Sequence, residues 1–203
     1  MFAGLPPVLG QDRLRAVGHG HKRIVYEVEG APSILVKLPR DGAGYVGAML
    51  RAEVRMARLS VVAPDMPVAR TLGLYPTDRG PGVVVGALRD ASGGIAPTLR
   101  ALHAGPRGAP GDAALLLTRC AAEARRSGLP VNDCNLGNFV LVERPGPPDE
   151  RRRLLMVDGF GDGRRWPVYH WSAALRDRQT ARRFRKAARQ LGLSWDMKRW
   201  SMR

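Results

Sequence analysis

Hydrophobic and polar residues alternate along the first part of the chain, which is the spacing of β-strands. Residues 13–38 predict a hairpin followed by a third strand, with glycines at the turns. Residues 45–59 instead carry apolar side chains at helical spacing and predict a helix. Two further strands are predicted at 68–75 and 82–88, separated by a turn rich in Pro and Gly. This part of the chain is therefore expected to form an antiparallel sheet with one helix.

The rest of the chain alternates helices with two β-rich runs. The predicted elements are a connector at 89–97, a helical turn at 98–103, a helix at 112–126, strands at 131–142 and 154–157, and a long helix at 172–191. Asp112 suits the N-cap of the second of these helices, and Gly128 is placed to end it. A sheet followed by helices around a hairpin predicts an α+β fold of two lobes, residues 1–88 and residues 89–203.

The amino-acid composition says more about the binding partners of the protein than about its fold. The 203 residues are 44% hydrophobic, enough for a core, and their net charge of +15 favours anionic partners. The 33 basic residues comprise 29 Arg and only four Lys. Cys120 and Cys134 are too few for a disulfide framework and are predicted to be buried thiols. Because neither a signal peptide nor an apolar run of about 20 residues is present, the sequence predicts a cytoplasmic protein with no transmembrane segment.

Asp133, Asn138 and Asp158 form the most informative polar pattern. Asp133 and Asn138 stand five positions apart before one β-rich run, and Asp158 follows a second such run. Phosphoryl transfer needs a carboxylate that orients the acceptor hydroxyl, together with oxygen ligands for Mg²⁺ on the nucleotide phosphates. We therefore interpret Asp133 as a catalytic residue and Asn138 and Asp158 as metal ligands. The alternative for these residues is a pair of Asx-rich turns at strand ends.

A second group of candidates lies in the first lobe. Gly18 and Gly20 stand in a turn whose backbone N–H groups can approach phosphates, and Val25 is placed to meet a nucleotide base. Lys37 ends a β-rich run and is predicted to pair phosphate oxygens, with Glu53 on the following helix as its partner. Lys37 and Glu53 are both predicted to be catalytic residues. The alternatives are an ordinary β-turn, a solvated lysine at a strand end and a surface glutamate.

The C-terminal region 164–203 is strongly basic, with twelve Lys or Arg against two acidic residues. The apolar stripe that its helix is predicted to bury consists of Leu175, Phe184, Ala188 and Leu191. The basic positions predicted to point outward are Arg178, Arg182, Arg185, Lys186 and Arg189. This pattern fits either a solvated helix face or a docking surface for an anionic membrane, with nucleic acid as the less expected partner.

Three segments of the sequence together resemble the PhoP regulatory network protein YrbL family, a compact branch of the protein-kinase-like superfamily. They are GHGHKRIVYEVEG with ILVK, VNDCNLGNFVLVE with LLMVDGFGD, and WPVYHWSAALRDRQTARRFRKAARQL. The resemblance implies a nucleotide-binding N-terminal lobe at 1–88 and a reduced, mainly helical C-terminal lobe with a catalytic hairpin at 89–203. It also implies ATP and Mg²⁺ as cofactors, and regulation within a Mg²⁺-responsive envelope-stress network.

The resemblance also carries over residue by residue, with some departures. The residues that it assigns to the roles given above are Gly18, Gly20, Lys37, Glu53, Asp133, Asn138 and Asp158. Arg23 replaces the third glycine of the kinase nucleotide loop. Val131 and Asn132 stand where kinases carry His and Arg, and Asn135 replaces a lysine. Gly159 is inserted between the metal aspartate and the Phe-Gly pair that follows it.

The sequence thus predicts a kinase-like phosphotransferase that moves a phosphoryl group from MgATP, bound between the lobes, to a hydroxyl acceptor. Because only 45 residues follow Asp158, a small molecule or an envelope sugar or lipid is expected as the acceptor rather than a protein. One alternative is a catalytically weak pseudokinase or regulatory binding module. Another is a binder of anionic lipid or nucleic acid that acts through the basic C-terminal helix.

Overall fold

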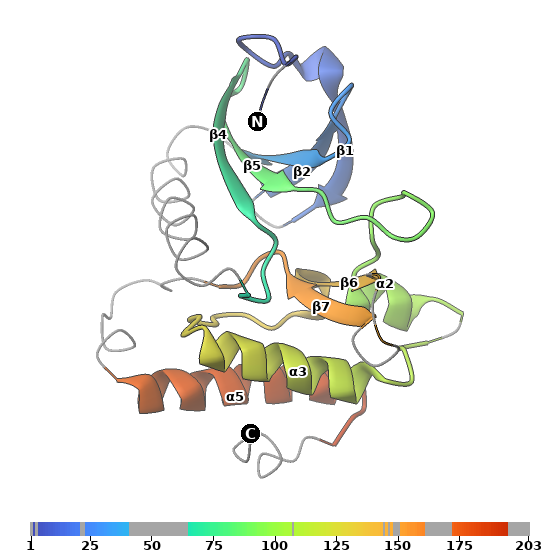
Figure 1. Ribbon diagram of the computed structural model, residues 1–203, viewed down its shortest axis with the longest axis vertical. Coiled ribbons are helices and arrows are strands. Elements are labelled where there is room, and N and C mark those ends of the chain that lie inside the picture. The colour runs from blue at the N-terminus through green and yellow to red at the C-terminus, as the bar shows by residue number, and fades with distance from the viewer. Residues whose placement is uncertain are drawn as a thin grey trace. The chain divides into compact units, whose positions relative to one another are not determined.

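A computed structural model describes residues 2, 4–20, 23–40, 65–106, 108–143, 145, 147, 151–160 and 172–194 (Figure 1). The chain forms two compact units. The first unit comprises Met1–Pro64 and Ala69–Leu88, and the second comprises Asp65–Val68 and Arg89–Arg203. The predicted boundary at residue 88 assigns the short segment Asp65–Val68 to the first lobe, whereas the structure places it in the second unit. The predicted helix at 45–59 lies outside the described residues.

The first unit is built on a five-stranded sheet in the order β1-β2-β3-β5-β4, in which every pair of neighbours is antiparallel. Its elements are a 3₁₀ turn η1 (Gln11–Arg13), β1 (Leu14–His19), β2 (Arg23–Val28), β3 (Ile34–Pro39), β4 (Thr71–Thr77) and β5 (Gly80–Gly86). β3 is the central strand and is buried along its whole length. Its run of branched apolar residues suits a strand covered on both faces.

The register of the strands assigns the side chains to two faces of this sheet. Val36 on β3 stands opposite Tyr26 on β2 and Val84 on β5. These three residues belong to one buried hydrophobic cluster, which also includes Leu9 from the N-terminal segment. Because side chains alternate along a strand, Lys37 points to the face opposite this cluster.

The hairpin of β4 and β5 differs from the prediction. The Pro- and Gly-rich segment expected to form the turn is largely strand, and Pro76 stands opposite Pro81 in the ladder. The turn itself is short, and the Thr77 hydroxyl donates to the Gly80 carbonyl across it at 2.6 Å. Proline is tolerated here because Pro76 lies on an edge strand and Pro81 lies near the start of β5.

The second unit combines helices with a two-stranded antiparallel sheet of β6 and β7. Its elements are α2 (Leu99–Ala104), α3 (Ala113–Arg126), a 3₁₀ turn η3 (Leu136–Asn138), β6 (Phe139–Glu143), β7 (Arg152–Met156) and α5 (Ala173–Gln190). α3 packs against both α5 and β7. The strand predicted at 131–142 is shorter in the structure, because the Asn- and Gly-containing residues before β6 form a loop and the turn η3.

Two of these three helices, α2 and α5, have an N-cap side chain that accepts a hydrogen bond. Thr98 accepts a hydrogen bond from the Ala101 N–H at 3.1 Å, and Ser172 caps α5 in the same way. Asp112 stands at the N-cap position of α3 but makes no capping hydrogen bond. Its carboxylate instead pairs with Arg152 on β7 at 2.8 Å, because a charged partner competes for the same oxygens.

The connector at 89–97 is a closed turn organised by Asp90. Its carboxylate accepts hydrogen bonds from the Ser92 hydroxyl at 2.6 Å and from the backbone N–H groups of Ser92 and Gly94 at 2.9 and 3.0 Å. The hydrogen bond from the Ser92 side chain is the main cause that lowers the pKa of Asp90 below its ordinary value. The negative charge of Asp90 is therefore part of what orders this turn.

α5 buries most of the predicted stripe, because Phe184 and Ala188 are buried and so is Leu191 at its C-cap. Its buried residues are Thr180, Ala181, Phe184, Ala187 and Ala188. Leu175 was expected in this stripe but is 41% exposed, because at about 100° per residue it faces the side of the helix opposite Phe184. The outward basic positions that the structure finds exposed are Arg178, Arg182, Lys186 and Arg189. None of the helices in the described part of the chain has the length and apolarity needed to span a bilayer.

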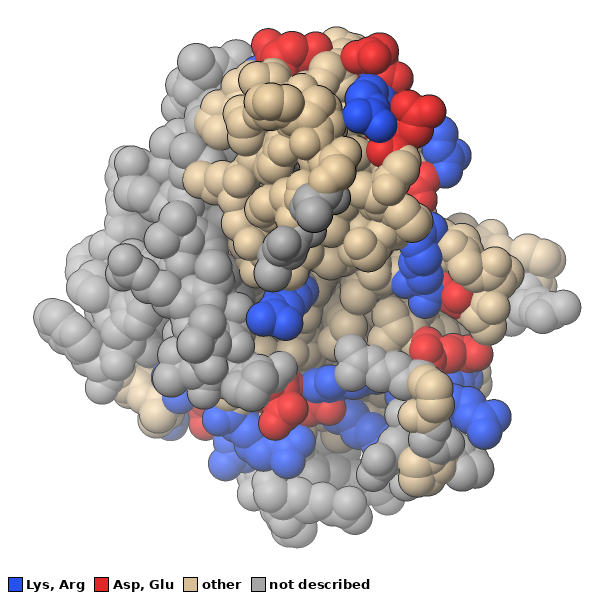
Figure 2. Space-filling model, turned by 45° about the horizontal axis from the view of Figure 1, so that its top comes forward, with Lys and Arg blue, Asp and Glu red and all other residues tan. Residues whose placement is uncertain are grey.

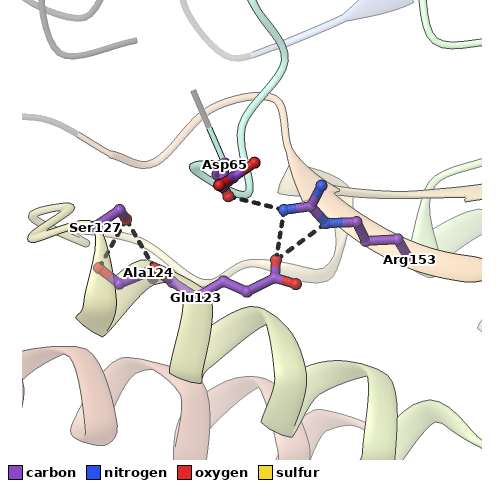
Figure 3. Close-up of polar contacts among 5 residues, drawn as sticks. All are labelled: Asp65, Glu123, Ala124, Ser127 and Arg153. Carbon is purple, nitrogen blue, oxygen red and sulfur yellow. Dashed lines mark hydrogen bonds and ion pairs between the residues drawn. The ribbon is translucent and has the colours of Figure 1, made fainter. Parts of the chain in front are cut away.

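Many basic side chains lie beside acidic ones, and Figure 2 shows both kinds next to each other on one face. In the second unit, Arg125 pairs with Asp177 at 3.2 Å. Arg153 on β7 donates through both Nε and Nη2 to Glu123 on α3, at 3.1 and 2.9 Å. Its Nη2 also donates to the Asp65 carbonyl oxygen at 2.8 Å (Figure 3). Arg153 therefore ties the segment Asp65–Val68 to α3 and β7.

We expect Arg153→Met to lower the free energy of unfolding by about 2 kcal/mol, because it leaves the half-buried Glu123 carboxylate without its charged donor. Urea denaturation monitored by circular dichroism measures this change. The matched control is Arg126→Met at the exposed end of α3, which should change stability by less than about 0.5 kcal/mol. Equal stability of the two variants would contradict a structural role for Arg153.

Candidate functional site

The two loops that carry the predicted catalytic and metal residues are joined through the backbone of Gly159. The Gly159 carbonyl oxygen accepts hydrogen bonds from the Asn132 N–H at 2.7 Å and from the Asp133 N–H at 2.8 Å. Val131, which precedes Asn132, and Phe160, which follows Gly159, form an antiparallel bridge. The loop before β6 and the loop after β7 are thus held as one unit, although they are distant in sequence.

Asn138 adds a side-chain link within the same site. Its Nδ2 donates to the Asp133 backbone oxygen at 3.3 Å and to the Asp133 Oδ2 at 3.4 Å. Its backbone carbonyl accepts from the Val157 N–H at 2.9 Å, which fixes Asn138 beside the end of β7. Because Nδ2 faces Asp133, Oδ1 is the atom of Asn138 that remains to ligate a cation.

Asp158 is exposed at the end of β7, and its Oδ1 accepts from the Gly159 N–H at 2.8 Å. The oxygens of Asp158 and Asn138 suit Mg²⁺, which is usually bound through one or two protein carboxylates together with water and phosphate oxygens. Within the described residues, no group of three or more His, Cys, Asp or Glu is arranged to hold a metal ion, so an all-protein cage is not found there.

Gly159 has no room for a side chain. Its φ of +82° lies in the left-handed region, and a Cβ built there would stand 2.0 Å from the Asp133 carbonyl oxygen and 2.7 Å from Asn138 Nδ2. Neither neighbour can move freely, because the Asp133 oxygen belongs to the backbone and Asn138 is held by its own hydrogen bonds. The Gly that departs from the kinase pattern is therefore the residue that allows the two loops to meet.

α5 contacts the loop before β6 and the start of β6 through the side chains of Gln179 and Phe184, and the sequence did not predict these contacts. The Gln179 side chain donates to the Val131 carbonyl oxygen at 3.0 Å and to Asn132 Oδ1 at 3.3 Å. The ring of Phe184 lies 5.5 Å from the ring of Phe139, which directly follows Asn138. No local pattern marks Gln179, because its partners stand 47 and 48 positions away in the sequence.

The two cysteines are free and buried, as predicted. Burial raises the pKa of both thiols, and for Cys134 the neighbouring Asp133 carboxylate raises the pKa further. A thiol held in its neutral form is a poor nucleophile. Cys134 is therefore a packing residue of this loop rather than a candidate nucleophile.

The first unit places three of the predicted nucleotide residues in one row across its sheet. Gly18 on β1 stands opposite Val25 on β2, and Val25 stands opposite Lys37 on β3. Residues directly opposite each other in an antiparallel pair lie on the same face. A Cβ added at Gly18 would lie 3.5 Å from the Val25 Cβ, so the row is closely packed. Gly20 closes the hairpin by donating its N–H to the Arg23 carbonyl oxygen at 2.8 Å.

The predicted site residues thus fall into two groups. Gly18, Val25 and Lys37 share one face of the sheet in the first unit, where Lys37 is only 7% exposed. Asp133, Asn138 and the loop of Asp158 meet in the second unit. Glu53, the predicted partner of Lys37, lies outside the described residues.

Comparison with known proteins decides the family. The sequence matches the family described as PhoP regulatory network protein YrbL over residues 11–192, which is most of the chain. This chain belongs to the YrbL family. A search of curated proteins finds no match to this YrbL-family chain.

The fold of this YrbL-family chain is protein-kinase-like, as predicted. A solved structure with a similar fold is a Stt7 homologue from Micromonas algae, whose crystal was soaked with ATP. The match has a TM-score of 0.62 and covers 93% of this chain and 71% of the algal chain. At 14% sequence identity the similarity is one of fold, and roles for individual residues have to come from the geometry of this chain.

We expect Gly159→Ala to lower the free energy of unfolding by more than about 2 kcal/mol, because it adds a backbone clash to a strained φ. The matched control is Gly192→Ala at the end of α5, where φ is +69° and no atom lies within 4 Å of the added Cβ. Chemical denaturation of both variants separates the two contributions. If Gly159→Ala were no more destabilising than Gly192→Ala, the close approach of the two loops would be refuted.

Proposed function

We propose that this YrbL-family protein is a kinase-like phosphotransferase that uses MgATP to phosphorylate a hydroxyl group. The observation that carries the proposal is the junction of Asp133, Asn138 and Gly159, in which the loop that carries Asp158 meets the loop that carries Asp133. The protein-kinase-like fold supports the same reaction class, and so does the ATP soak of the structurally similar algal protein.

In this proposal, the second unit provides the chemistry. Asp133 accepts the hydrogen bond of the acceptor hydroxyl and orients it for attack on the terminal phosphate. Asn138, through Oδ1, and Asp158 would hold Mg²⁺, which supplies positive charge to the phosphate oxygens when bound. The hydrogen bond from Asn138 to Asp133 keeps the Asp133 carboxylate in place while both residues act.

The first unit would contribute nucleotide contacts. Lys37 supplies a positive charge on the sheet face opposite the hydrophobic cluster, and Val25 in the same row supplies an apolar contact for the base. Gly18 leaves the neighbouring strand without a side chain in this row, so a phosphate can approach its backbone. Glu53 is proposed to pair with Lys37.

The main alternative is a pseudokinase that binds nucleotide without turnover. It is favoured by the neutral Asn135 and by the residues Val131 and Asn132 before Asp133, where protein kinases use basic side chains. The two functions share nucleotide binding and differ in chemistry, so binding and turnover have to be measured separately.

The wild-type protein should bind ATP only when Mg²⁺ is present, and Asp158→Ala should weaken this binding by at least about tenfold, which is about 1.4 kcal/mol. Isothermal titration calorimetry with and without Mg²⁺ measures it. The control variant is Glu143→Ala, which removes an exposed carboxylate at the far end of β6 in the same unit. ATP affinity that is the same in wild type and Asp158→Ala would rule out the metal site.

Turnover separates the phosphotransferase from the pseudokinase. Release of ADP from MgATP, with water as the acceptor, should fall by about 10²- to 10⁴-fold in Asp133→Asn, because the general base is lost. MgATP binding by this variant should stay close to that of wild type. A wild-type rate no higher than that of Asp133→Asn would favour the pseudokinase.

A further inference from the structure

Arg100 on α2 reaches the loop that carries Asp133. Its Nη2 donates a hydrogen bond to the side-chain oxygen of Asn135. Its guanidinium also lies over Gly137, where an added Cβ would stand 3.5 Å from both Cζ and Nε. Two independent contacts thus place this arginine on a loop segment that begins two residues after Asp133 and ends just before Asn138.

The partner of Arg100 is neutral, unlike the partners of several other arginines of the second unit. Arg125, Arg152 and Arg153 all pair with carboxylates of Asp or Glu. Arg100 has no carboxylate partner among the described residues and is exposed to solvent. The hydrogen bond to Asn135 therefore orients the guanidinium without neutralising it.

Asn135 is itself held in place, so the orientation is defined. The Asn135 side-chain oxygen accepts a second hydrogen bond from the Gly137 N–H at 3.2 Å. A guanidinium has five N–H donors in a planar fork, and the contact with Asn135 uses one nitrogen. The other donors suit a phosphate or carboxylate, which binds this fork through two parallel hydrogen bonds.

We propose that Arg100 forms an anion-binding subsite for a phosphate or carboxylate group on the acceptor molecule. The inference rests on the proposed phosphotransferase function, since it places the anion beside the hydroxyl that Asp133 orients. An acceptor role is favoured over a nucleotide role because Arg100 contacts the segment 135–137, whereas the proposed metal ligands meet at Gly159. The acceptor class is therefore an anionic hydroxyl compound, such as a phosphorylated sugar or lipid head group.

The test uses inorganic phosphate and MgATP as separate probes in calorimetric titrations of the full-length protein at constant ionic strength. Three variants each reduce the net charge from +15 to +14: Arg100→Gln, Asn135→Asp and Arg126→Gln. Arg126 lies at the end of α3 and controls for the lost charge. Asn135→Asp keeps both hydrogen bonds of residue 135 but gives Arg100 a charged partner. Thermal unfolding of each variant confirms that it is folded.

We expect phosphate binding to weaken by at least about tenfold in Arg100→Gln, because a charge-assisted pair is lost. Asn135→Asp should weaken it similarly, although Arg100 is still present. Arg126→Gln should match wild type, and MgATP affinity should stay within about twofold in all three variants. The Asn135→Asp result is decisive, because a purely structural Arg100 would tolerate or benefit from a carboxylate partner.

Other results would overturn the inference. Phosphate binding that is absent in wild type, retained in Asn135→Asp or equally weakened in Arg126→Gln would remove the subsite. An equal loss of MgATP affinity in Arg100→Gln would assign the anion to the nucleotide instead of the acceptor. A wild-type protein that binds phosphate through Arg100 but never binds MgATP would reject the proposed function, and the acceptor assignment with it.

Discussion

The carbonyl oxygen of Gly159 accepts two consecutive backbone N–H groups, and the geometry of the second unit's site depends on this pair of hydrogen bonds. Buried or half-buried backbone donors need partners, and here the partner comes from a loop more than twenty residues away. The absence of a side chain at position 159 is what lets the oxygen come this close. Asn138 then adds a side-chain contact to Asp133, so the carboxylate is positioned by backbone and side chain together.

The sequence predicted the elements that are governed by local periodicity, and it failed where distant partners decide. The strands around residues 23–39 were predicted because branched apolar residues alternate there. The turn between β4 and β5 was placed too broadly, since proline usually ends a strand but is accepted at a sheet edge. Asp112 was predicted as a cap, and instead Arg152 takes its carboxylate from forty positions away.

The site shows the same division between local and distant information. Asp133, Asn138 and Asp158 were predicted from their spacing around strand ends, and the structure brings the first two together with the loop that carries the third. No local sequence pattern distinguishes Gln179 or Arg100. Gln179 contacts Asn132, which is 47 positions away, and Arg100 contacts Asn135, which is 35 positions away. In a chain with 29 arginines, composition cannot tell a neutralised guanidinium from one that faces a neutral partner. Only the identity of the contacting group makes that distinction.

The segment Asp65–Val68 has a consequence for how the protein can be divided. It belongs to the second unit, although the chain before it and after it belongs to the first. Val68 pairs with Met156, and the Pro67 carbonyl accepts a hydrogen bond from the Met156 N–H at 2.7 Å. This short segment therefore lies beside the end of β7. The polypeptide therefore passes from one unit to the other three times. A single cut near residue 88 would not yield two intact modules. The N-terminal fragment would keep Pro67 and Val68, which pair with Met156 in the C-terminal fragment.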